Sequence, residues 1–201
     1  MMRARILLFD GFDELDAIGP YEVLANALRG RDGDVAYVTL EGPREVPANH
    51  GTLVRANAAL GDDVTLLIVP GGGWNDRSPH GARAEAERGE IPRAIAAAHA
   101  RGATIASVCT GGMLVAASGL LRGRPAVTHH GALNDLAASG ADVVAARVVD
   151  DGEILSAGGV TSGIDLALHI VERELGSEVA DDVAREMEHD RRGPVHRTDG
   201  A

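Results

Sequence analysis

The sequence contains no lysine, because all 19 residues in its Lys+Arg count are arginine. Schiff-base and pyridoxal-phosphate chemistry both need a lysine amine, and so does the phosphate-binding lysine of a P-loop. The absence of lysine therefore excludes these mechanisms for this chain.

Cysteine is nearly absent as well, since Cys109 is the single one in 201 residues. One cysteine cannot form an intramolecular disulfide, which fits a reducing compartment or indifference to one. The first apolar run ends at Asp10 and is too short for a signal-peptide core or a membrane span. We therefore expect a cytoplasmic protein with no membrane partner.

Acidic residues outnumber basic ones by 30 to 19, so the net charge is −11. Nucleic-acid binding needs a basic surface to neutralise phosphates, and the arginines do not cluster into one, so we expect no nucleic-acid partner. The 8 histidines show neither H-E-x-x-H spacing nor a Cys/His cluster. The sequence thus gives no support for a metal site.

What is present is a globular composition, with 45% hydrophobic and 24% charged residues. We expect one domain over residues 1–190 and a loose polar tail over residues 191–201. Strand-like apolar runs alternate with helical patterns, which predicts a mostly parallel sheet covered by helices on both faces. The main expected strands cover residues 5–9, 34–40, 64–69, 103–108 and 143–149, with a hairpin around residues 49–51 at the edge of the sheet. The main expected helices begin at residues 19–20, 90, 131, 161 and 177.

The stretch around Cys109 reads ATIASVCTGGMLVAASG, a small-residue strand followed by a helical pattern. A cysteine at a sharp turn from strand to helix has the position of a nucleophile elbow, where helix amides favour the thiolate. The other interpretation is a buried structural cysteine, which is common for a lone cysteine.

Ligands bind beyond the carboxyl ends of the strands in open sheets of this kind. The connections after three strands bring Asp16, the glycines 71–73 and Cys109 to that edge. Backbone amides of Gly72, Gly73 or Thr110 would stabilise charge that develops during attack by the thiolate. Asp16 is the candidate general acid and base, with a turn or helix-capping aspartate as the alternative.

His129 and His130 follow a short expected strand and give a rival hypothesis. One of them would form a Cys-His pair with Cys109, in which the imidazole activates the thiol. The alternative is a packing residue or a cap for the helix that follows.

Five segments together resemble the PfpI superfamily, in the same order and over nearly the whole chain. They are LLFDGFDELDAIGPYEVL, LLIVPGGG, ASVCTGGMLVAASGLLRG, the Thr128-His129 pair, and RVVDDGEILSAGGVTSGIDLALHIVER. The resemblance implies a three-layer, flavodoxin-like fold of the class I glutamine amidotransferase type. Within the superfamily the chain is most similar to the isonitrile hydratase branch.

That branch pairs a cysteine in S-V-C-T-G with an aspartate in L-D-x-x-G-P, which match Cys109 and Asp16. The resemblance implies hydration of a small isonitrile to a formamide without cofactor or metal, by a homodimer, with Gly72, Gly73, Thr110 and His129 around the substrate. Protease-like members carry histidine where this chain has Thr110. Deglycase-like members carry glutamate where it has Asp16.

Two alternative functions stay open at this stage. One is a glyoxalase-like or deglycase-like enzyme acting on reactive carbonyls such as methylglyoxal. The other is a non-enzymatic sensor of oxidants or ligands, which uses Cys109. Related sequences also form the sensing half of transcription regulators with a helix-turn-helix domain, and we expect no such domain after the last helix of this sequence.

Overall fold

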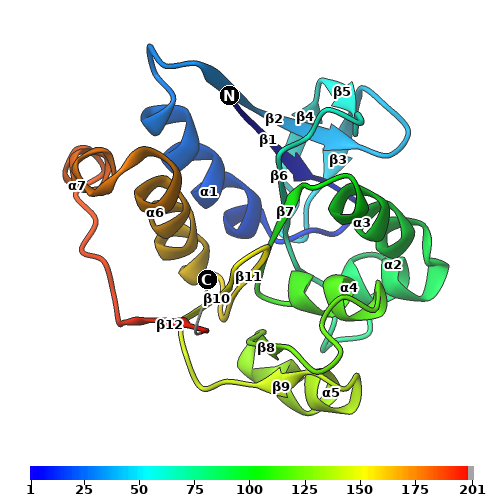
Figure 1. Ribbon diagram of the computed structural model, residues 1–201. Coiled ribbons are helices and arrows are strands. Elements are labelled where there is room, and N and C mark those ends of the chain that lie inside the picture. Colours follow the sequence, from blue (N-terminus) through cyan, green and yellow to red (C-terminus); the bar gives the residue numbers. More distant parts are fainter. Residues whose placement is uncertain (199–201) are drawn as a thin grey trace.

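A computed structural model describes residues 1–198 of the chain. Its centre is an eight-stranded sheet of order β12-β10-β11-β7-β6-β1-β2-β5 (Figure 1). Neighbouring strands are parallel except for β10 and β11, which form an antiparallel pair. The strands of this sheet are β1 (Met2–Leu7), β2 (Gly33–Thr39), β5 (Ala58–Ala59), β6 (Leu66–Val69), β7 (Thr104–Val108), β10 (Val148–Asp151), β11 (Ile154–Ala157) and β12 (Val195–Arg197).

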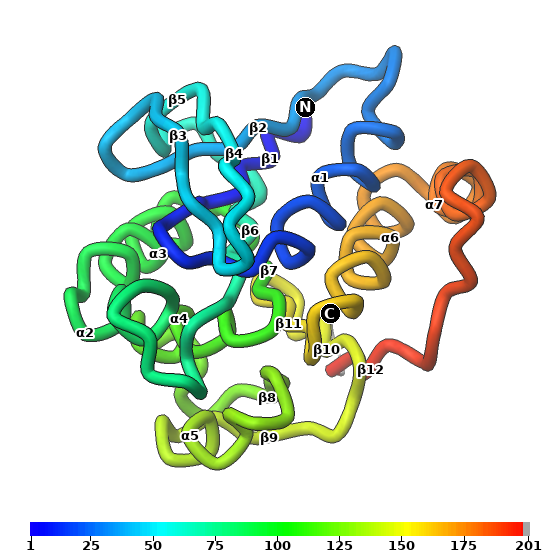
Figure 2. Tube along the Cα trace, turned by 180° about the vertical axis from the view of Figure 1, so that it is seen from behind, coloured from blue at the N-terminus to red at the C-terminus, as the bar shows by residue number. Residues whose placement is uncertain are grey.

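Helices cover both faces of the sheet, and the views from opposite sides in Figures 1 and 2 agree on this. Three of them pack together on one face: α1 (Glu14–Ala27), α6 (Ser162–Leu175) and α7 (Ser177–Glu186). The other face carries α2 (Ala82–Arg88), α3 (Glu90–Ala100) and α4 (Gly111–Ala117). Because β6 lies between two helical layers, all four of its residues are buried. The predicted three-layer α/β fold is confirmed.

Two small sheets stand apart from the central one. β3 (Arg44–Pro47) and β4 (Leu53–Ala56) form the antiparallel hairpin expected around residues 49–51. β8 (Pro125–Ala126) pairs with β9 (Asp142–Val143), and α5 (Leu133–Ala138) lies between them in the chain after the short helix η1 (His130–Ala132). The single strand expected over residues 143–149 is therefore wrong, because its first residue pairs with β8 and only its end joins the central sheet.

The beginning of α1 also differs from the prediction. Gly19 and Pro20 were expected to open this helix, but it begins at Glu14 and Pro20 lies inside it. Asp13 supplies the N-cap, since its side chain accepts a hydrogen bond from the backbone of Leu15. Asp16 consequently lies in the first turn of a helix and not in a loop.

The polar tail is more ordered than its composition indicates. Residues 195–197 form β12, which pairs in parallel with β10 at the edge of the sheet. Backbone hydrogen bonds hold this strand, so it needs no apolar pattern, and residues 195–197 depart from the loose tail that was expected from residue 191. The rest of the expected tail, residues 199–201, lies outside the described residues.

No helix within residues 1–198 combines the length and the apolar character that a membrane span requires.

Candidate active site

Three connections meet at the carboxyl edge of the sheet, as the strand-end rule predicts. The backbone N–H of Asp13, just before α1, donates to the carbonyl of Gly71 at 2.8 Å. The N–H of Gly71 in turn donates to Oδ2 of Asp16 at 2.9 Å. The N–H of Gly72 donates to Oγ1 of Thr110 at 2.9 Å, which ties the glycine turn to the cysteine turn.

Cys109 occupies the sharp turn between β7 and α4. Its φ of 55° lies in the left-handed region, which costs a non-glycine residue about 1 kcal/mol or more. Its N–H donates to the carbonyl of Ala157 at 3.0 Å, and its carbonyl accepts from Oγ1 of Thr128 at 2.7 Å. The fold thus holds the strained conformation from both sides, which is the geometry of a nucleophile elbow.

The turn is also too tight for side chains next to it. A Cβ atom on Gly111 would lie 2.1 Å from the carbonyl oxygen of Val69, and one on Gly71 would lie 2.5 Å from the backbone nitrogen of Thr110. Glycine at both positions therefore lets the turn after β6 pack directly on the cysteine turn.

Asp16 is fully buried on α1, beside the thiol. Burial and, to a smaller extent, the negative charge of Asp13 raise its pKa to about 8, although the amide of Gly71 and the thiol of Cys109 oppose this. The other carboxyl oxygen, Oδ1, is buried and accepts no hydrogen bond from any group within residues 1–198. The carboxyl group therefore holds a proton near neutral pH and has an oxygen available for proton transfer.

The thiol of Cys109 is 6% exposed and behaves differently from the sequence-based expectation. Burial raises its pKa above the ordinary value, and the carboxyl groups of Asp16 and Asp13 raise it further. The backbone and side chain of Thr110 act in the opposite direction but are weaker. The expectation of a free thiolate at a helix N-terminus is wrong for the resting site, because burial and a neighbouring carboxyl group outweigh the dipole of a two-turn helix.

The amides of Gly72, Gly73 and Thr110, each predicted from the sequence as a stabiliser of charge, have different roles in the structure. The amide of Thr110 is the one that stabilises charge on Cys109. Gly72 instead uses its amide to orient Thr110, and a Cβ on Gly73 would lie 2.4 Å from the carbonyl of His80. Gly73 thus packs against the loop before α2.

His129 caps the short helix η1, as the alternative interpretation stated. Its Nδ1 accepts from the N–H of Gly131 at 3.1 Å and lies 3.3 Å from Nδ2 of Asn75. Burial and the adjacent His130 lower its pKa, so the ring is neutral near pH 7. Among the described residues, no hydrogen bond joins His129 to Cys109.

Sequence reasoning missed the roles of two groups that shape this site. Thr128 anchors the carbonyl of Cys109, and Gly71 binds the carboxyl group of Asp16. Thr128 lies two residues beyond β8 and was named as part of the resemblance, but no local signal shows that its hydroxyl binds the cysteine turn. Gly71 was visible as part of a glycine turn, but spacing alone does not show which amide faces the carboxyl group.

We expect Thr110→Val to weaken activity more than stability. The valine keeps the volume but removes the acceptor for the Gly72 N–H, so the free energy of unfolding should fall by about 1–2 kcal/mol. Turnover should fall by about tenfold or more, because the amide of residue 110 then moves relative to Cys109. Thr110→Ser keeps the oxygen and is the control; equal turnover in both variants would contradict this role.

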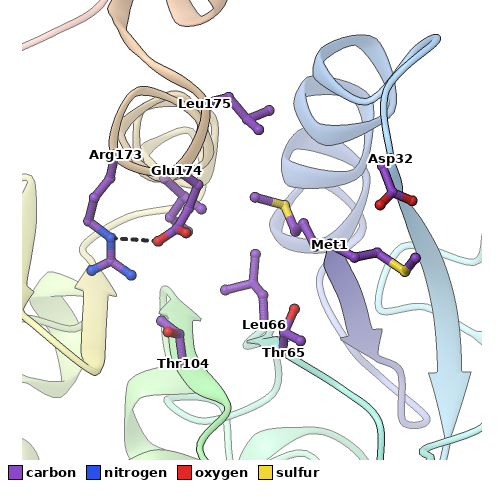
Figure 3. A pocket seen from close by; sticks show the side chains of 10 residues that line it. Met1, Asp32, Thr65, Leu66, Thr104, Arg173, Glu174 and Leu175 are labelled. Atoms are coloured by element: carbon purple, nitrogen blue, oxygen red, sulfur yellow. Dashed lines mark hydrogen bonds and ion pairs between the residues drawn. The ribbon is translucent and has the colours of Figure 1, made fainter.

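A separate cavity of about 230 Å³ lies at the opposite edge of the sheet (Figure 3). Thr65, Leu66 and Thr104 line it from the beginnings of β6 and β7, and the Arg173–Glu174 ion pair lines it from the end of α6. The cavity is thus remote from Cys109 and takes no part in the candidate site.

Comparisons with known proteins agree with this geometry. The sequence profile of the DJ-1/PfpI family matches residues 2–173. An isonitrile hydratase of Pseudomonas putida is 32% identical over 186 residues, which cover 91% of this chain and 76% of that protein. A deglycase of Pyrococcus abyssi is 30% identical over 159 residues, which cover 77% of this chain and 89% of that protein.

A solved structure gives the same result. The crystal structure of a ThiJ/PfpI family protein from Pseudomonas syringae superposes with a TM-score of 0.84 at 27% identity, covering 96% of this chain and 77% of that one. The match spans most of the chain in sequence and in fold, so this protein is a member of the DJ-1/PfpI family.

Proposed function

We propose that the protein is a cysteine-dependent isonitrile hydratase, which adds water to an isonitrile and gives an N-substituted formamide. The observation that carries this proposal is the pairing of the Asp16 carboxyl group with the Cys109 thiol in one buried site. Thr110 follows the cysteine, and the similarity to the Pseudomonas putida isonitrile hydratase adds support.

The first half of the reaction adds the thiol to the substrate. Sγ of Cys109 bonds to the terminal carbon of the isonitrile while the thiol proton passes through Asp16 to the same carbon. The product is a thioimidate, with a C–S bond, a new C–H bond and a C=N double bond. The amide of Thr110 stabilises negative charge on sulfur before the bond forms.

The second half releases the product. Water adds to the thioimidate carbon as Asp16 takes one of its protons and passes that proton to the nitrogen. The C–S bond then breaks as the carbonyl forms, and the remaining hydroxyl proton returns through Asp16 to the sulfur. No net oxidation occurs, and the thiol and carboxyl group end in their starting states.

The alternatives receive less support from the site. A deglycase-like activity is compatible with the similarity to the Pyrococcus protein, but the resemblance places glutamate at the position of Asp16 in that branch. An oxidant sensor needs an accessible thiolate, whereas burial raises the pKa of this thiol and leaves it 6% exposed.

One assay of the purified protein tests these functions in parallel. Formamide is measured with a small isonitrile, and loss of methylglyoxal is measured under the same conditions. Formamide production with little loss of methylglyoxal supports the proposal; the reverse result favours the carbonyl enzyme. No turnover on either compound, with stoichiometric sulfinic acid at Cys109 after mild peroxide, would favour a sensor.

We also propose a homodimer that acts on a small molecule, while the cytoplasmic location stays a prediction. Large apolar side chains are exposed near the site, at 36% for Leu15 and 37% for Ile18 on α1 and 62% for Leu53 on β4. They belong to one region, because the N–H of His50 in the β3–β4 turn donates to Glu14 of α1 at 2.9 Å. Such a patch favours burial against a second copy.

Light scattering is expected to give twice the mass of one chain. Leu53→Glu should shift the protein toward the mass of a monomer, because it places a charge in the apolar patch. Val143→Glu is the matched control, since Val143 is 39% exposed on β9 and lies outside that patch. A monomer mass for the unchanged protein would contradict the dimer.

A further inference from the structure

A second cavity, of about 500 Å³, lies at the carboxyl edge of the sheet, and we call it the β11 pocket. The two glycines that follow β11, Gly158 and Gly159, form one side of it, and Val127, Leu133 and Val144 form the apolar part of its wall. Its volume lies in the usual range for small-molecule pockets, about 300–1,000 Å³. The cavity has no role in the proposed reaction steps or in what the family resemblance implies.

The β11 pocket adjoins the cysteine turn. β11 runs parallel to β7 with Ala157 opposite Val108, so Gly158 is the next residue beside Cys109. The N–H of Cys109 donates to the carbonyl of Ala157, and Thr128, which binds the carbonyl of Cys109, also lines the pocket. The pocket therefore begins one residue away from the nucleophile.

The chemistry of its wall suits an uncharged group. Arg147 is the charged residue in the lining, but Nε donates to Asp165 at 2.6 Å and a terminal nitrogen donates to Thr161 at 3.1 Å. Because Asp165 neutralises the guanidinium and fixes its direction, the arginine makes a poor partner for an anionic substituent. The apolar side chains of Val127, which is buried, and Leu133, which is partly buried, favour a hydrocarbon group.

The two glycines differ in the space beside them. A Cβ atom on Gly158 would make ordinary contacts at 3.8 Å with Thr128 and Val127. A Cβ atom on Gly159 would have no atom within 4 Å, and the φ of this residue is not positive. A larger residue at position 159 therefore fits the backbone and extends into open space at the pocket.

We propose that the β11 pocket binds the substituent on the nitrogen of the isonitrile and that the enzyme favours neutral, bulky hydrocarbon substituents, with Gly159 as the residue that determines this specificity. This inference rests on the proposed function, because it names the substrate class for the same site. The isonitrile carbon lies at Cys109, and the substituent passes Gly159 into the pocket.

Gly159→Val tests this inference with two substrates, methyl isocyanide and cyclohexyl isocyanide. The valine should lower kcat/KM for the cyclohexyl compound by about tenfold or more, because loss of space for a few carbons changes specificity on this scale. The value for the methyl compound should stay within about twofold. Gly61→Val is the matched control, since Gly61 precedes β6 at the opposite edge and a Cβ there meets only the exposed side chain of Asp63.

The outcomes separate the inference from the proposed function. An equal effect of Gly159→Val on both isonitriles, or no effect on either, overturns the pocket assignment but leaves isonitrile hydration standing. If the unchanged protein hydrates neither compound, the proposed function fails, and alkylation of Cys109 decides the pocket. Mass spectrometry follows the alkylation of Cys109 by iodoacetamide and by N-cyclohexyl-iodoacetamide. If Gly159→Val slows alkylation by the cyclohexyl reagent more than by iodoacetamide, the result supports the pocket. Equal slowing with both reagents overturns it.

Discussion

The Cys109→Ser variant is expected to produce no measurable formamide from a small isonitrile. A serine hydroxyl is a far weaker nucleophile than a thiol near neutral pH, and within residues 1–198 no imidazole is hydrogen-bonded to residue 109 to activate it. We expect kcat to fall by a factor on the order of 10⁴ or more, as with loss of other covalent nucleophiles. Formamide release, followed by chromatography, measures the effect.

Serine keeps the fold, so the loss is chemical and not structural. The side chain has nearly the same size, and the backbone bonds of residue 109 to Ala157 and Thr128 do not involve the sulfur. The melting temperature should stay close to that of the unchanged protein, which a thermal scan checks. Formamide production near the original rate in this variant would rule out the thioimidate mechanism.

Asp16→Asn is the second substitution with a large expected effect, a fall in kcat/KM by about 10²–10⁴. An amide cannot take the thiol proton or deliver one to the isonitrile carbon, although it fills the same volume. Asp13→Asn is the matched control on the same helix, because asparagine also caps a helix and only the charge is lost. Comparable losses in both variants would contradict a specific role for Asp16.

The dependence of activity on pH gives a sharper test of the same pair. The reaction needs one proton shared between Asp16 and Cys109, and below pH 8 both groups are protonated. Activity should therefore rise with pH through an apparent pKa of about 8. Asp16→Asn should remove this rise, and Asp13→Asn should shift it to lower pH, because Asp13 helps to raise the pKa of Asp16.

Stability should change in the opposite direction from activity. The carboxyl group of Asp16 ionises near its ordinary pKa in the unfolded chain but keeps its proton up to about pH 8 in the folded one. Between these values unfolding releases a proton, so the folded state loses stability as pH rises. Asp16→Asn lacks this penalty and should have a higher melting temperature at pH 7 but not at pH 4. If the difference in melting temperature between Asp16→Asn and the unchanged protein is the same at pH 4 and pH 7, the raised pKa of Asp16 is contradicted.

The sequence by itself determined the layer order of the fold and the three connections that meet at the site. Buried runs such as residues 66–69 and the glycines behind them have a local cause, since a strand between two helical layers must be apolar and a tight turn needs glycine. The placement of Asp16 and Cys109 at the carboxyl edge followed from the alternation of strands and helices, because the connections after parallel strands meet at that edge.

Only the tertiary structure decided the protonation of the site and the roles of its donors. The pKa values of Asp16 and Cys109 depend on burial by segments far apart in the chain, and burial reversed the prediction of a free thiolate. Gly72 and Gly73 are neighbours in sequence, yet one orients Thr110 and the other packs near His80, because the turn directs successive residues to different sides. Similarly, the β11 pocket is lined by residues from segments 127–133, 143–147 and 158–162, which only the folded chain brings together, so no local pattern encodes the open space beside Gly159.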